Sequence, residues 1–318
     1  MRRIALTVNA VDRPTIDRKT QKEPVPYLGG VSIAIGILFA SYFALAYNEV
    51  TKNNLFAASS VLIPAAVLGV MGLVDDLRGL PPWPRLIAQS FVGVIVAGIL
   101  ITTDTIGTPS QVFVIDAIIS IFWIVGVCNS INFFDNLDGG AAGTVVVISF
   151  FTFLIAYDRG QLMISALSIV TAGATAGFLI WNRPPAKIYM GDAGALFLGI
   201  IVAVLTIRLN PDIQPTWKSL SIPLFLMAVP LLDTSVAVIS RLSRGISPFT
   251  GGRDHLSHRL MRKGLHRRTA AITLWALAGV YGTIAFAIYK GQATALIALA
   301  AITWAYLFFF FIRIPHTD

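Results

Sequence analysis

The chain has 318 residues, of which 56% are hydrophobic and only 13% are charged, and its mean hydropathy is +0.76. So few charges could not cover the surface of a soluble protein, so the composition excludes that class and indicates an integral membrane protein. The formal net charge is +8, but in a membrane protein basic residues relate first to topology, so we expect no nucleic-acid partner.

Ten apolar windows are long enough to cross about 30 Å of hydrocarbon. In chain order they are residues 28–47, 55–74, 85–101, 112–128, 141–157, 162–181, 193–209, 220–240, 270–289 and 293–312. Pro223 and Pro230 should bend the eighth span. The sequence therefore predicts an all-α, polytopic membrane protein with about ten transmembrane helices and a single domain over residues 1–318.

The connections between these spans alternate between two sides of the membrane. One side holds residues 1–27, 75–84, 129–140, 182–192, 241–269 and the C-terminal tail. With Arg85 and Arg241 counted at its boundary, this side carries 19 of the 24 Lys and Arg residues, which leaves five for the other. The positive-inside rule assigns the basic side, and with it both termini, to the cytoplasm.

Acidic residues are scarce, and those in or beside apolar runs lie in three stretches on this same side. The stretches are residues 73–77, 129–139 and 189–193, in a chain with only 16 Asp and Glu residues. A charge at the centre of a span costs at least ~2.5–3.5 kcal/mol, so carboxylates near membrane edges need a reason. Gathered at one face, they predict a cytoplasmic active site for a cation, a phosphate or both.

The first candidates in chain order are one lysine and a pair of carboxylates. Lys22 lies in the basic, proline-punctuated segment that enters the first span, where it is a natural phosphate contact. Asp75 and Asp76 end the second span. Adjacent carboxylates usually mark a solvated helix end, but beside other acids they could bind Mg²⁺ or act as a base on a phosphate.

A polar stripe ends the fourth span. Asn129, Asn132, Asp135 and Asp138 recur every three residues, so on a helix they would share one face. This face is either a satisfied polar cluster between helices or a binding surface. An EF-hand is excluded, because a loop counted from Asp135 has Val146 at the position of its closing Glu.

Asp192 is the last residue of the 182–192 connection and lies between Gly191 and Gly194, which places it at a helix N-terminus. Asp is favoured there as a cap, and the same terminus attracts phosphate, so the two roles are compatible. Asp233 lies within the eighth span, where we expect it to pair with Arg241 or Arg244.

The longest inner loop, residues 241–269, is basic. It contains Arg253, Asp254, His255 and His258. Anchoring beside anionic lipid accounts for part of its charge, but not for two His residues beside Arg and Asp. That combination suits a diphosphate and its leaving group, whereas zinc would need a further ligand nearby.

Five motifs, in this order, resemble the polyprenyl-phosphate N-acetylhexosamine-1-phosphate transferase family (glycosyltransferase family 4). They are Asp12-Arg-Pro through Lys22 with Pro24-Val-Pro-Tyr-Leu-Gly-Gly30, then Asp75-Asp76, Asn129 through Asp138-Gly139, Met190-Gly-Asp192, and His255-Leu-Ser-His258. Within the family, the chain is more similar to the branch that makes polyprenyl-diphospho-N-acetylglucosamine. The muramoyl-pentapeptide branch typically has consecutive His residues followed by Phe-Glu, which this loop does not have.

The resemblance implies a reaction. N-acetylhexosamine 1-phosphate, most simply GlcNAc 1-phosphate, would pass from a UDP-sugar to undecaprenyl or decaprenyl phosphate, with release of UMP. It also implies Mg²⁺ (Mn²⁺ as a substitute), the cell inner membrane, the first membrane step of cell-envelope polysaccharide synthesis, and a homodimer as a candidate assembly. Direct attack and a covalent aspartyl intermediate both stay open.

By position within the family motifs, Asp192 is the implied metal ligand, with Asn132. Asp75 is the implied base or phosphate-positioning group, supported by Asp76, and His255 completes the catalytic set. The residues implied to bind substrate are Lys22, Arg85, Asn129, Asn132, Asp135, Asp138, Tyr189, Arg253, Asp254, His255 and His258. Four positions depart from the family pattern: Arg85 replaces the usual Lys, Asn136 replaces Gly, Gly140 replaces Leu and Ser257 replaces a middle His found in many relatives.

The sequence leaves three alternative functions to compare. The first is that of the muramoyl-pentapeptide transferase. A CDP-alcohol phosphotransferase would need an Asp-Gly-x-x-Ala-Arg start, whereas Asp138-Gly139 is followed by Gly-Ala-Ala-Gly. A membrane transporter, from a different class, predicts charged groups near mid-membrane and often repeated halves, whereas most acids here lie at one face.

Overall fold

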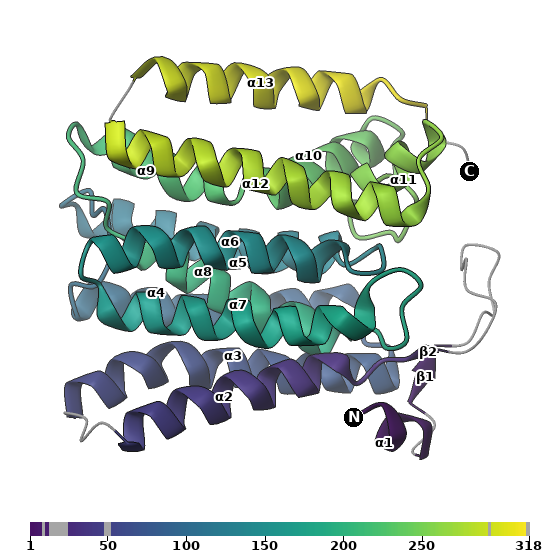
Figure 1. Cartoon of the computed structure of the whole chain (residues 1–318), viewed down its shortest axis with the longest axis horizontal. Coiled ribbons are helices and arrows are strands. Elements are labelled where there is room, and N and C mark those ends of the chain that lie inside the picture. Colours follow the sequence, from purple (N-terminus) through teal and green to yellow (C-terminus); the bar gives the residue numbers. More distant parts are fainter. Residues whose placement is uncertain (8–9, 13–24, 48–51, 292–293, 316–318) are drawn as a thin grey trace.

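A computed structural model describes residues 1–7, 10–12, 25–47, 52–291 and 294–315. Nearly all regular structure in these ranges is helical. Nine of the described helices are long and apolar enough to cross a membrane, or ten spans if one bent pair counts as a single span. The prediction of an all-α, multi-pass membrane protein is confirmed (Figure 1).

The long helices follow the predicted spans in order. They are α2 (Gly29–Tyr47), α3 (Lys52–Arg78), α4 (Pro82–Thr102), α5 (Phe113–Phe134), α6 (Gly140–Asp158), α7 (Leu162–Asn182), α8 (Gly191–Arg208), α9 (Thr216–Leu226), α10 (Ala228–Leu242), α12 (Arg267–Gly291) and α13 (Thr294–Ile312). The short elements are α1 (Arg2–Thr7), the antiparallel strands β1 (Val11–Asp12) and β2 (Val25–Pro26), and α11 (Leu256–Arg262).

The eighth predicted span consists of two helices. α9 and α10 meet at Met227 with an angle of 73° between them. Pro230 has no N–H to donate to the carbonyl of Leu226, four residues earlier, so the helical ladder is interrupted at this junction. The predicted bend is therefore confirmed.

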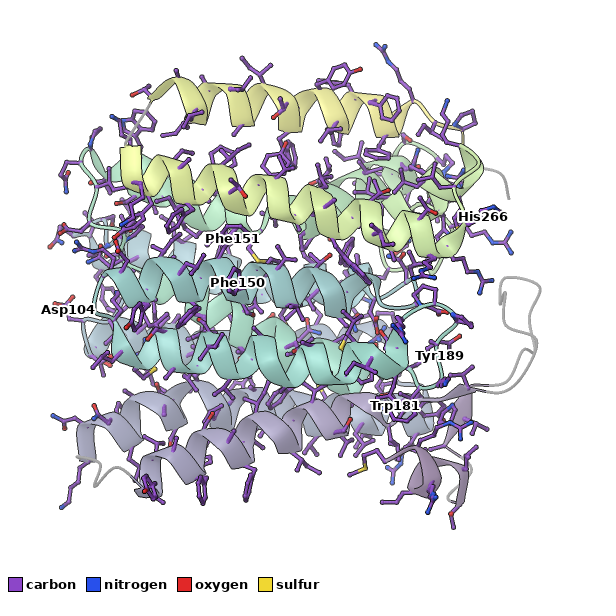
Figure 2. The ribbon with its side chains drawn as sticks, in the orientation of Figure 1. Asp104, Phe150, Phe151, Trp181, Tyr189 and His266 are labelled. Carbon is purple, nitrogen blue, oxygen red and sulfur yellow. The ribbon has the colours of Figure 1, made fainter. Side chains whose placement is uncertain are left out.

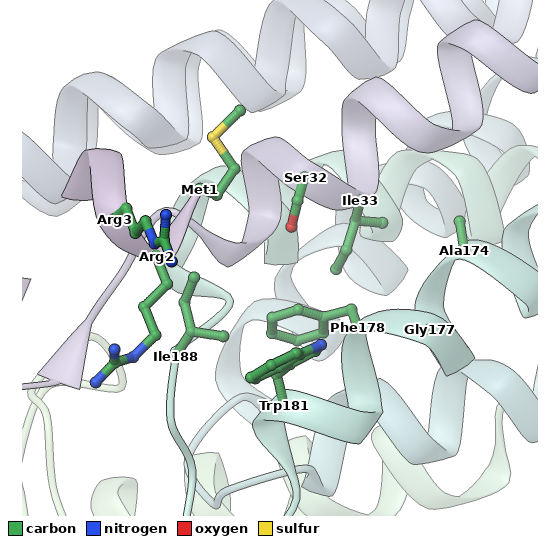
Figure 3. A pocket seen from close by; sticks show the side chains of 10 residues that line it. All are labelled: Met1, Arg2, Arg3, Ser32, Ile33, Ala174, Gly177, Phe178, Trp181 and Ile188. Atoms are coloured by element: carbon green, nitrogen blue, oxygen red, sulfur yellow. The ribbon is translucent and has the colours of Figure 1, made fainter. Parts of the chain in front are cut away.

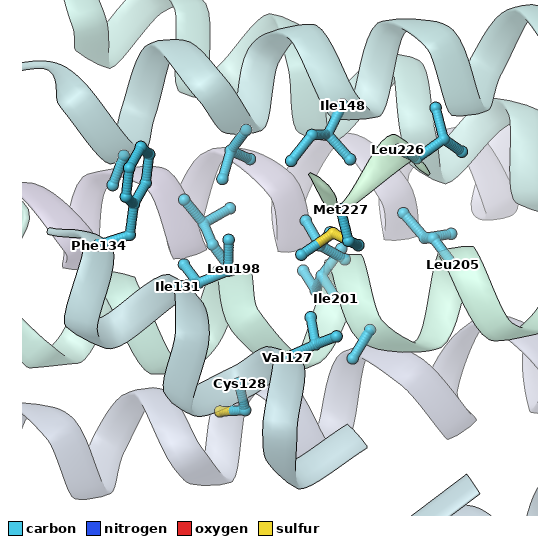
Figure 4. Close-up of a cluster of buried hydrophobic side chains, with 14 of the residues drawn as sticks. Val127, Cys128, Ile131, Phe134, Ile148, Leu198, Ile201, Leu205, Leu226 and Met227 are labelled. Carbon is cyan, nitrogen blue, oxygen red and sulfur yellow. The ribbon is translucent and has the colours of Figure 1, made fainter. Parts of the chain in front are cut away.

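α8 is the central helix of the bundle. Every residue from 193 to 206 is buried, chiefly against α3 and α5. Its side chains interdigitate with those of α5 near the α9–α10 junction, where Ile131 and Leu198 lie in one cluster with Met227 (Figure 4). Since only the first turn of α8 reaches the end of the bundle, its polar start is held in place by an apolar core.

A glycine sets the distance between α3 and α8. A Cβ atom on Gly72 would lie 2.3 Å from the carbonyl oxygen of Asp192, closer than any real contact. Any larger residue would push the two helices apart. The end of α3, which carries Asp75 and Asp76, thus lies directly against the first turn of α8.

The three acidic stretches gather at one end of the bundle. The loops before α8 and after α10 lie at this end, together with α1 and the C-terminus (Figure 1). Trp181, Tyr189 and His266 are also at this end, whereas Asp104 is at the opposite one (Figure 2). Successive connections between the described helices thus alternate between the two ends of the bundle, as the sequence predicts.

A pocket of about 530 Å³ lies between α1, α2 and α7. Phe178 and Trp181 form part of its wall, with Ile33 from α2, and Arg2 and Arg3 lie at one end (Figure 3). Its lining is mostly apolar, as expected for a hollow between transmembrane helices.

Candidate active site

One guanidinium joins the carboxylates of two helices. Nη1 of Arg85 lies 2.6 Å from Oδ2 of Asp75 and 3.1 Å from Oδ2 of Asp192. Asp75 is buried, and its Oδ1 accepts a hydrogen bond from the N–H of Leu80 at 2.6 Å. Arg85, the departure from the usual Lys, therefore connects the ends of α3, α4 and α8 at the predicted site.

Asp76 caps α8. Its Oδ1 accepts the N–H of Asp192 at 2.9 Å, and its Oδ2 accepts the N–H of Ala193 at 3.1 Å. First-turn N–H groups have no partner within their own helix, and the helix dipole favours an anion beside them. Gly191, with a φ of +71°, turns the chain into α8 where a Cβ would collide with this carboxylate. The cap that the sequence suggested for Asp192 is thus supplied by Asp76.

α5 continues beyond its predicted end at residue 128 to Phe134, so Asn129 and Asn132 lie on the helix. Nδ2 of Asn132 donates to Oδ1 of Asp192 at 2.7 Å. Nδ2 of Asn129 instead donates to Oε1 of Gln89 on α4 at 2.5 Å. Both interpretations of the polar stripe therefore apply, each to one residue: Asn132 faces the site, and Asn129 joins two helices.

Asp135 lies beyond the end of α5, so the shared helical face does not reach it. Its half-buried carboxylate accepts no hydrogen bond and forms no ion pair among the described residues. Burial, together with the nearby carboxylates of Asp192 and Asp76, raises the pKa of Asp135 to about 8. An unpaired carboxylate facing other carboxylates marks a position that a cation would stabilise.

Two side chains tie the loop after α5 to the loop before α8. Oδ2 of Asp138 accepts the N–H of Ala186 at 3.0 Å. Asn182, which is buried, accepts the N–H of Gly139 at 3.0 Å and donates to the carbonyl of Ile188 at 2.9 Å. Asn182 could not be predicted from the sequence, because a single Asn at the end of an apolar span has no periodicity or motif to mark it.

Tyr189 lies where β2 meets the loop before α8. Its N–H donates to the carbonyl of Pro26 at 2.7 Å, and its carbonyl accepts the N–H of Gly29 at 3.0 Å. The segment that enters the first span is thus fixed beside the Asp192 stretch. Lys22, predicted as a phosphate contact in that segment, lies outside the described residues.

The His loop forms a second cluster, around the buried Arg241 of α10. Nε2 of His255 lies 3.0 Å from Nη2 of Arg241, and Nδ1 lies 2.7 Å from Oδ2 of Asp233. The other oxygen of Asp233 accepts the N–H of Leu256 at 2.7 Å. The expected pairing of Asp233 with Arg241 or Arg244 is therefore wrong, because both of its oxygens are occupied by the loop that follows α10.

Asp254 is the partner of the two arginines. Its Oδ2 accepts a hydrogen bond from Nε of Arg241 at 3.1 Å, and its Oδ1 pairs with Nη2 of Arg244. Burial opposes ionisation of Asp254, but the two guanidinium groups outweigh it, so its pKa is lowered overall. The buried carboxylate of Asp254 thus binds the guanidinium groups of Arg241 and Arg244.

His258 and Arg253 complete the loop. His258 is half-buried, and its ring centroid lies 6.4 Å from that of His255. Burial, and then the neighbouring His255, lowers the pKa of His258 to about 4, so its imidazole is neutral near pH 7. Arg253 is half-buried, and its carbonyl accepts a hydrogen bond from Nη1 of Arg262 at 3.0 Å.

The end of α5 connects the two clusters. The ring of Phe133 lies edge-on to His255, with centroids 6.4 Å apart, and the guanidinium of Arg241 is 5.9 Å from the same ring. Oδ1 of Asn136 accepts a hydrogen bond from Oγ of Ser257. Two departures from the family pattern thus contact each other across this junction.

The oxygen atoms at the start of α8 are of the kind that suits a magnesium ion arriving with phosphate. The described residues contain no group of three or more His, Cys, Asp or Glu side chains placed to hold a metal. Four carboxylates nevertheless gather here, and Arg85 is the only cation paired with any of them in the described part of the chain. Mg²⁺ commonly takes one or two protein carboxylates and completes its shell with water and phosphate oxygens.

Comparisons with known proteins agree with the motif order. The model of Glycosyl transferase family 4 matches residues 58–210. The chain is 30% identical to the probable undecaprenyl-phosphate N-acetylglucosaminyl 1-phosphate transferase of Bacillus subtilis, over 99% of this chain and 84% of that protein. It is also 30% identical to the decaprenyl-phosphate N-acetylglucosaminephosphotransferase of Mycobacterium tuberculosis, over 96% of this chain and 82% of that protein. A phospho-N-acetylmuramoyl-pentapeptide-transferase of Streptococcus thermophilus is 31% identical, but over 60% of this chain and 61% of its own length.

Proposed function

The chain belongs to glycosyl transferase family 4, and we propose that it transfers GlcNAc 1-phosphate from UDP-GlcNAc to a polyprenyl phosphate and releases UMP. The observation that carries the proposal is the convergence of Asp75, Asn132 and Asp192 around Arg85 at one end of the bundle. The relatives named for GlcNAc-phosphate transfer align with nearly the whole chain, whereas the pentapeptide transferase aligns with less than two thirds of it.

In the proposed reaction, an oxygen of the polyprenyl phosphate forms a bond to the β-phosphorus of the UDP-sugar. The bond from that phosphorus to the oxygen bridging the two phosphates breaks, and UMP leaves with the electron pair. Positioning and charge stabilisation supply most of the catalysis of such transfers. We propose that Asp75 helps to position the lipid phosphate. Its Oδ2 accepts a hydrogen bond from the guanidinium of Arg85, and this guanidinium can also bind phosphate.

We assign Asp192 and Asn132 to Mg²⁺, with Mn²⁺ as a substitute. When bound, the metal would neutralise charge on the diphosphate. Asp76 keeps Asp192 at the start of α8 through the two backbone hydrogen bonds. Asp135, whose carboxylate has no partner in the described part of the chain, adds negative charge to this position.

The nucleotide is proposed to lie between the loops that Asp138 and Asn182 join, with Tyr189 beside the uracil. We propose that His258 and Arg253 contact the diphosphate or the sugar. Asp254 and His255 act indirectly, because their polar atoms are used in holding Arg241 and Arg244.

We propose that this enzyme lies in the cell inner membrane with both termini in the cytoplasm. Its multi-pass topology and its excess of basic residues on one side support this proposal. The site would then meet cytosolic nucleotide at its open face and lipid phosphate at the edge of the bilayer.

The purified protein, mixed with undecaprenyl phosphate in detergent, tests the proposal against a panel of UDP-sugars. UDP-GlcNAc should give UMP and a lipid-linked product in equal amounts, dependent on Mg²⁺, and UDP-MurNAc-pentapeptide should give neither. Asp192→Asn should abolish both products, and full activity in this variant refutes the metal assignment. Turnover of the pentapeptide substrate instead, or of no UDP-sugar while a solute crosses proteoliposomes, contradicts the proposed function.

A further inference from the structure

A cationic pocket of about 430 Å³ lies beside the candidate site, between the end of α7 and the start of α12. Its principal lining residues are Trp181, Arg183, Lys187, Arg268, Ile272 and Trp275. None of the residues that line this pocket belongs to the proposed active site or to the family motifs. Trp181 also lines the larger pocket on the other side of α7.

The charge of the pocket is positive and uncompensated. Arg183, Lys187 and Arg268 are exposed, and none of them forms an ion pair with a carboxylate among the described residues. No acidic residue lines the pocket. Nζ of Lys187 lies 5.7 Å from the centre of the Trp181 ring, which keeps the ammonium at the pocket wall. Three cations in a hollow with no acid attract an anion.

The residues of the pocket walls indicate what kind of anion would bind there. The pocket lies at the last turn of one span and the first turn of another, where tryptophan side chains occupy the headgroup level of a bilayer. The side chains of Trp181 and Ile272 are 54% and 46% exposed, so an apolar surface runs from the cations toward the lipid. A soluble anion would leave this surface uncovered, whereas an amphiphile would cover it.

We propose that this pocket binds an anionic glycerophospholipid of the surrounding leaflet. Its phosphate would contact Arg183, Lys187 and Arg268, and its acyl chains would lie against Trp181 and Ile272. Neither the shape nor the charge of the pocket depends on a bound sugar or nucleotide. Binding of the lipid is therefore independent of the proposed reaction.

The pocket shares its wall with the loops of the candidate site. Arg183 and Lys187 flank the Ala186 N–H that Asp138 accepts. Nε1 of Trp275 donates to the carbonyl of Gly139 at 3.0 Å. A lipid bound to these two cations would restrain the loop before α8, so anionic lipid should also increase turnover.

Native mass spectrometry of the full chain, released from micelles with equimolar phosphatidylglycerol and phosphatidylcholine, tests the binding. Phosphatidylglycerol should be retained preferentially. Arg183→Gln, Lys187→Gln and Arg268→Gln should each reduce this preference about fivefold, as expected for one basic residue near an anionic headgroup. Lys263→Gln is the matched control, because Lys263 is exposed at the same end but outside the pocket.

Equal retention of the two lipids by the unmodified chain, or an equal loss of preference in Lys263→Gln, would overturn the proposal. So would full displacement of phosphatidylglycerol by inorganic phosphate or UMP, which would identify a site for soluble anions. The assay needs no turnover, so an inactive protein that still retains phosphatidylglycerol refutes the proposed reaction and leaves the lipid site standing. Thermal melting of each variant in detergent establishes that the fold is intact.

Discussion

His255 accepts a hydrogen bond from Arg241. Nε2 of the imidazole lies 3.0 Å from Nη2 of the guanidinium, which can only donate, so the proton of the neutral ring is on Nδ1, facing Asp233. Both ring nitrogens are therefore engaged inside the protein. The sequence motif predicts a catalytic role for His255; from this geometry we propose that it is instead a positioning residue that orients Arg241.

Replacing His255 tests this distinction. We expect His255→Ala to lower kcat about 10–100-fold, the usual effect of removing a side chain that orients its neighbours beside an active site. His255→Gln should recover part of the activity, because its carbonyl can still accept from Arg241. The pH–rate profile should keep its shape in both variants. Loss of one ionisation from that profile would instead make His255 an acid or base of the reaction.

Arg85 should tolerate lysine but not glutamine. The two contacts with Asp75 and Asp192 come from a single nitrogen, Nη1, which an ammonium group could replace. Arg85→Gln leaves Asp75 buried without its counter-charge, and breaking such a pair typically destabilises by ~3–5 kcal/mol; Arg85 is itself partly exposed, so the lower end is expected. Thermal melting and UMP release measure the two effects, and an Arg85→Lys variant as impaired as Arg85→Gln would show that the guanidinium shape matters.

The ionised carboxylate of Asp135 should destabilise the folded protein, although we propose that its negative charge contributes to the metal position. Its pKa is raised from 3.8 to about 8 in the folded state, mainly by burial, so the folded chain binds more protons than the unfolded chain between these values. Stability therefore falls as the pH rises through this window. Without Mg²⁺, Asp135→Asn should raise the melting temperature at pH 8 more than at pH 5, and should reduce turnover.

Asp104→Asn is the control for that measurement, because Asp104 is exposed at the opposite end of the bundle. Equal shifts of the melting temperature at the two pH values in Asp135→Asn would show that its carboxyl titrates normally.

Asn136 and Ser257 should behave as a coupled pair. Their side chains form a hydrogen bond between the end of α5 and the His loop. Asn136→Gly and Ser257→His restore the usual family residues one at a time, and each should reduce activity because the other partner is left unmatched. The double variant should be better than the sum of the two losses, with a coupling energy of about 0.5–3 kcal/mol. Strictly additive losses would mean that the hydrogen bond has no functional effect.

Periodicity and charge were enough to predict the spans, their alternation and the carboxylates at one end. They could not predict contacts between side chains and distant backbone groups. They did not predict that Nδ2 of Asn129 donates to Gln89, because spacing shows which face of a helix a residue is on and not which helix lies opposite. Asn182 and Arg259 likewise could not be singled out from the sequence, because their partners are backbone groups of distant segments.

Arg259 shows the limit of the positive-inside rule. The rule counts it as one more cytoplasmic cation, yet it is fully buried. Its Nη1 donates to the carbonyls of Phe311 at 2.8 Å and Ile314 at 2.6 Å, and its Nε donates to the carbonyl of Asp254 at 2.7 Å. One side chain thus satisfies carbonyls at the C-terminal end of α13 and fixes the His loop against it.

Arg259→Met should therefore loosen two distant segments together. The variant keeps most of the apolar volume but leaves these buried carbonyls without a donor, and each such group destabilises by about 1–3 kcal/mol. Hydrogen exchange should increase both at residues 311–314 and around Asp254, while Lys263→Gln, an exposed neighbour on the same loop, should change neither. Faster exchange in only one of the two segments would show that Arg259 does not couple them, because a shared donor cannot be removed from one acceptor alone.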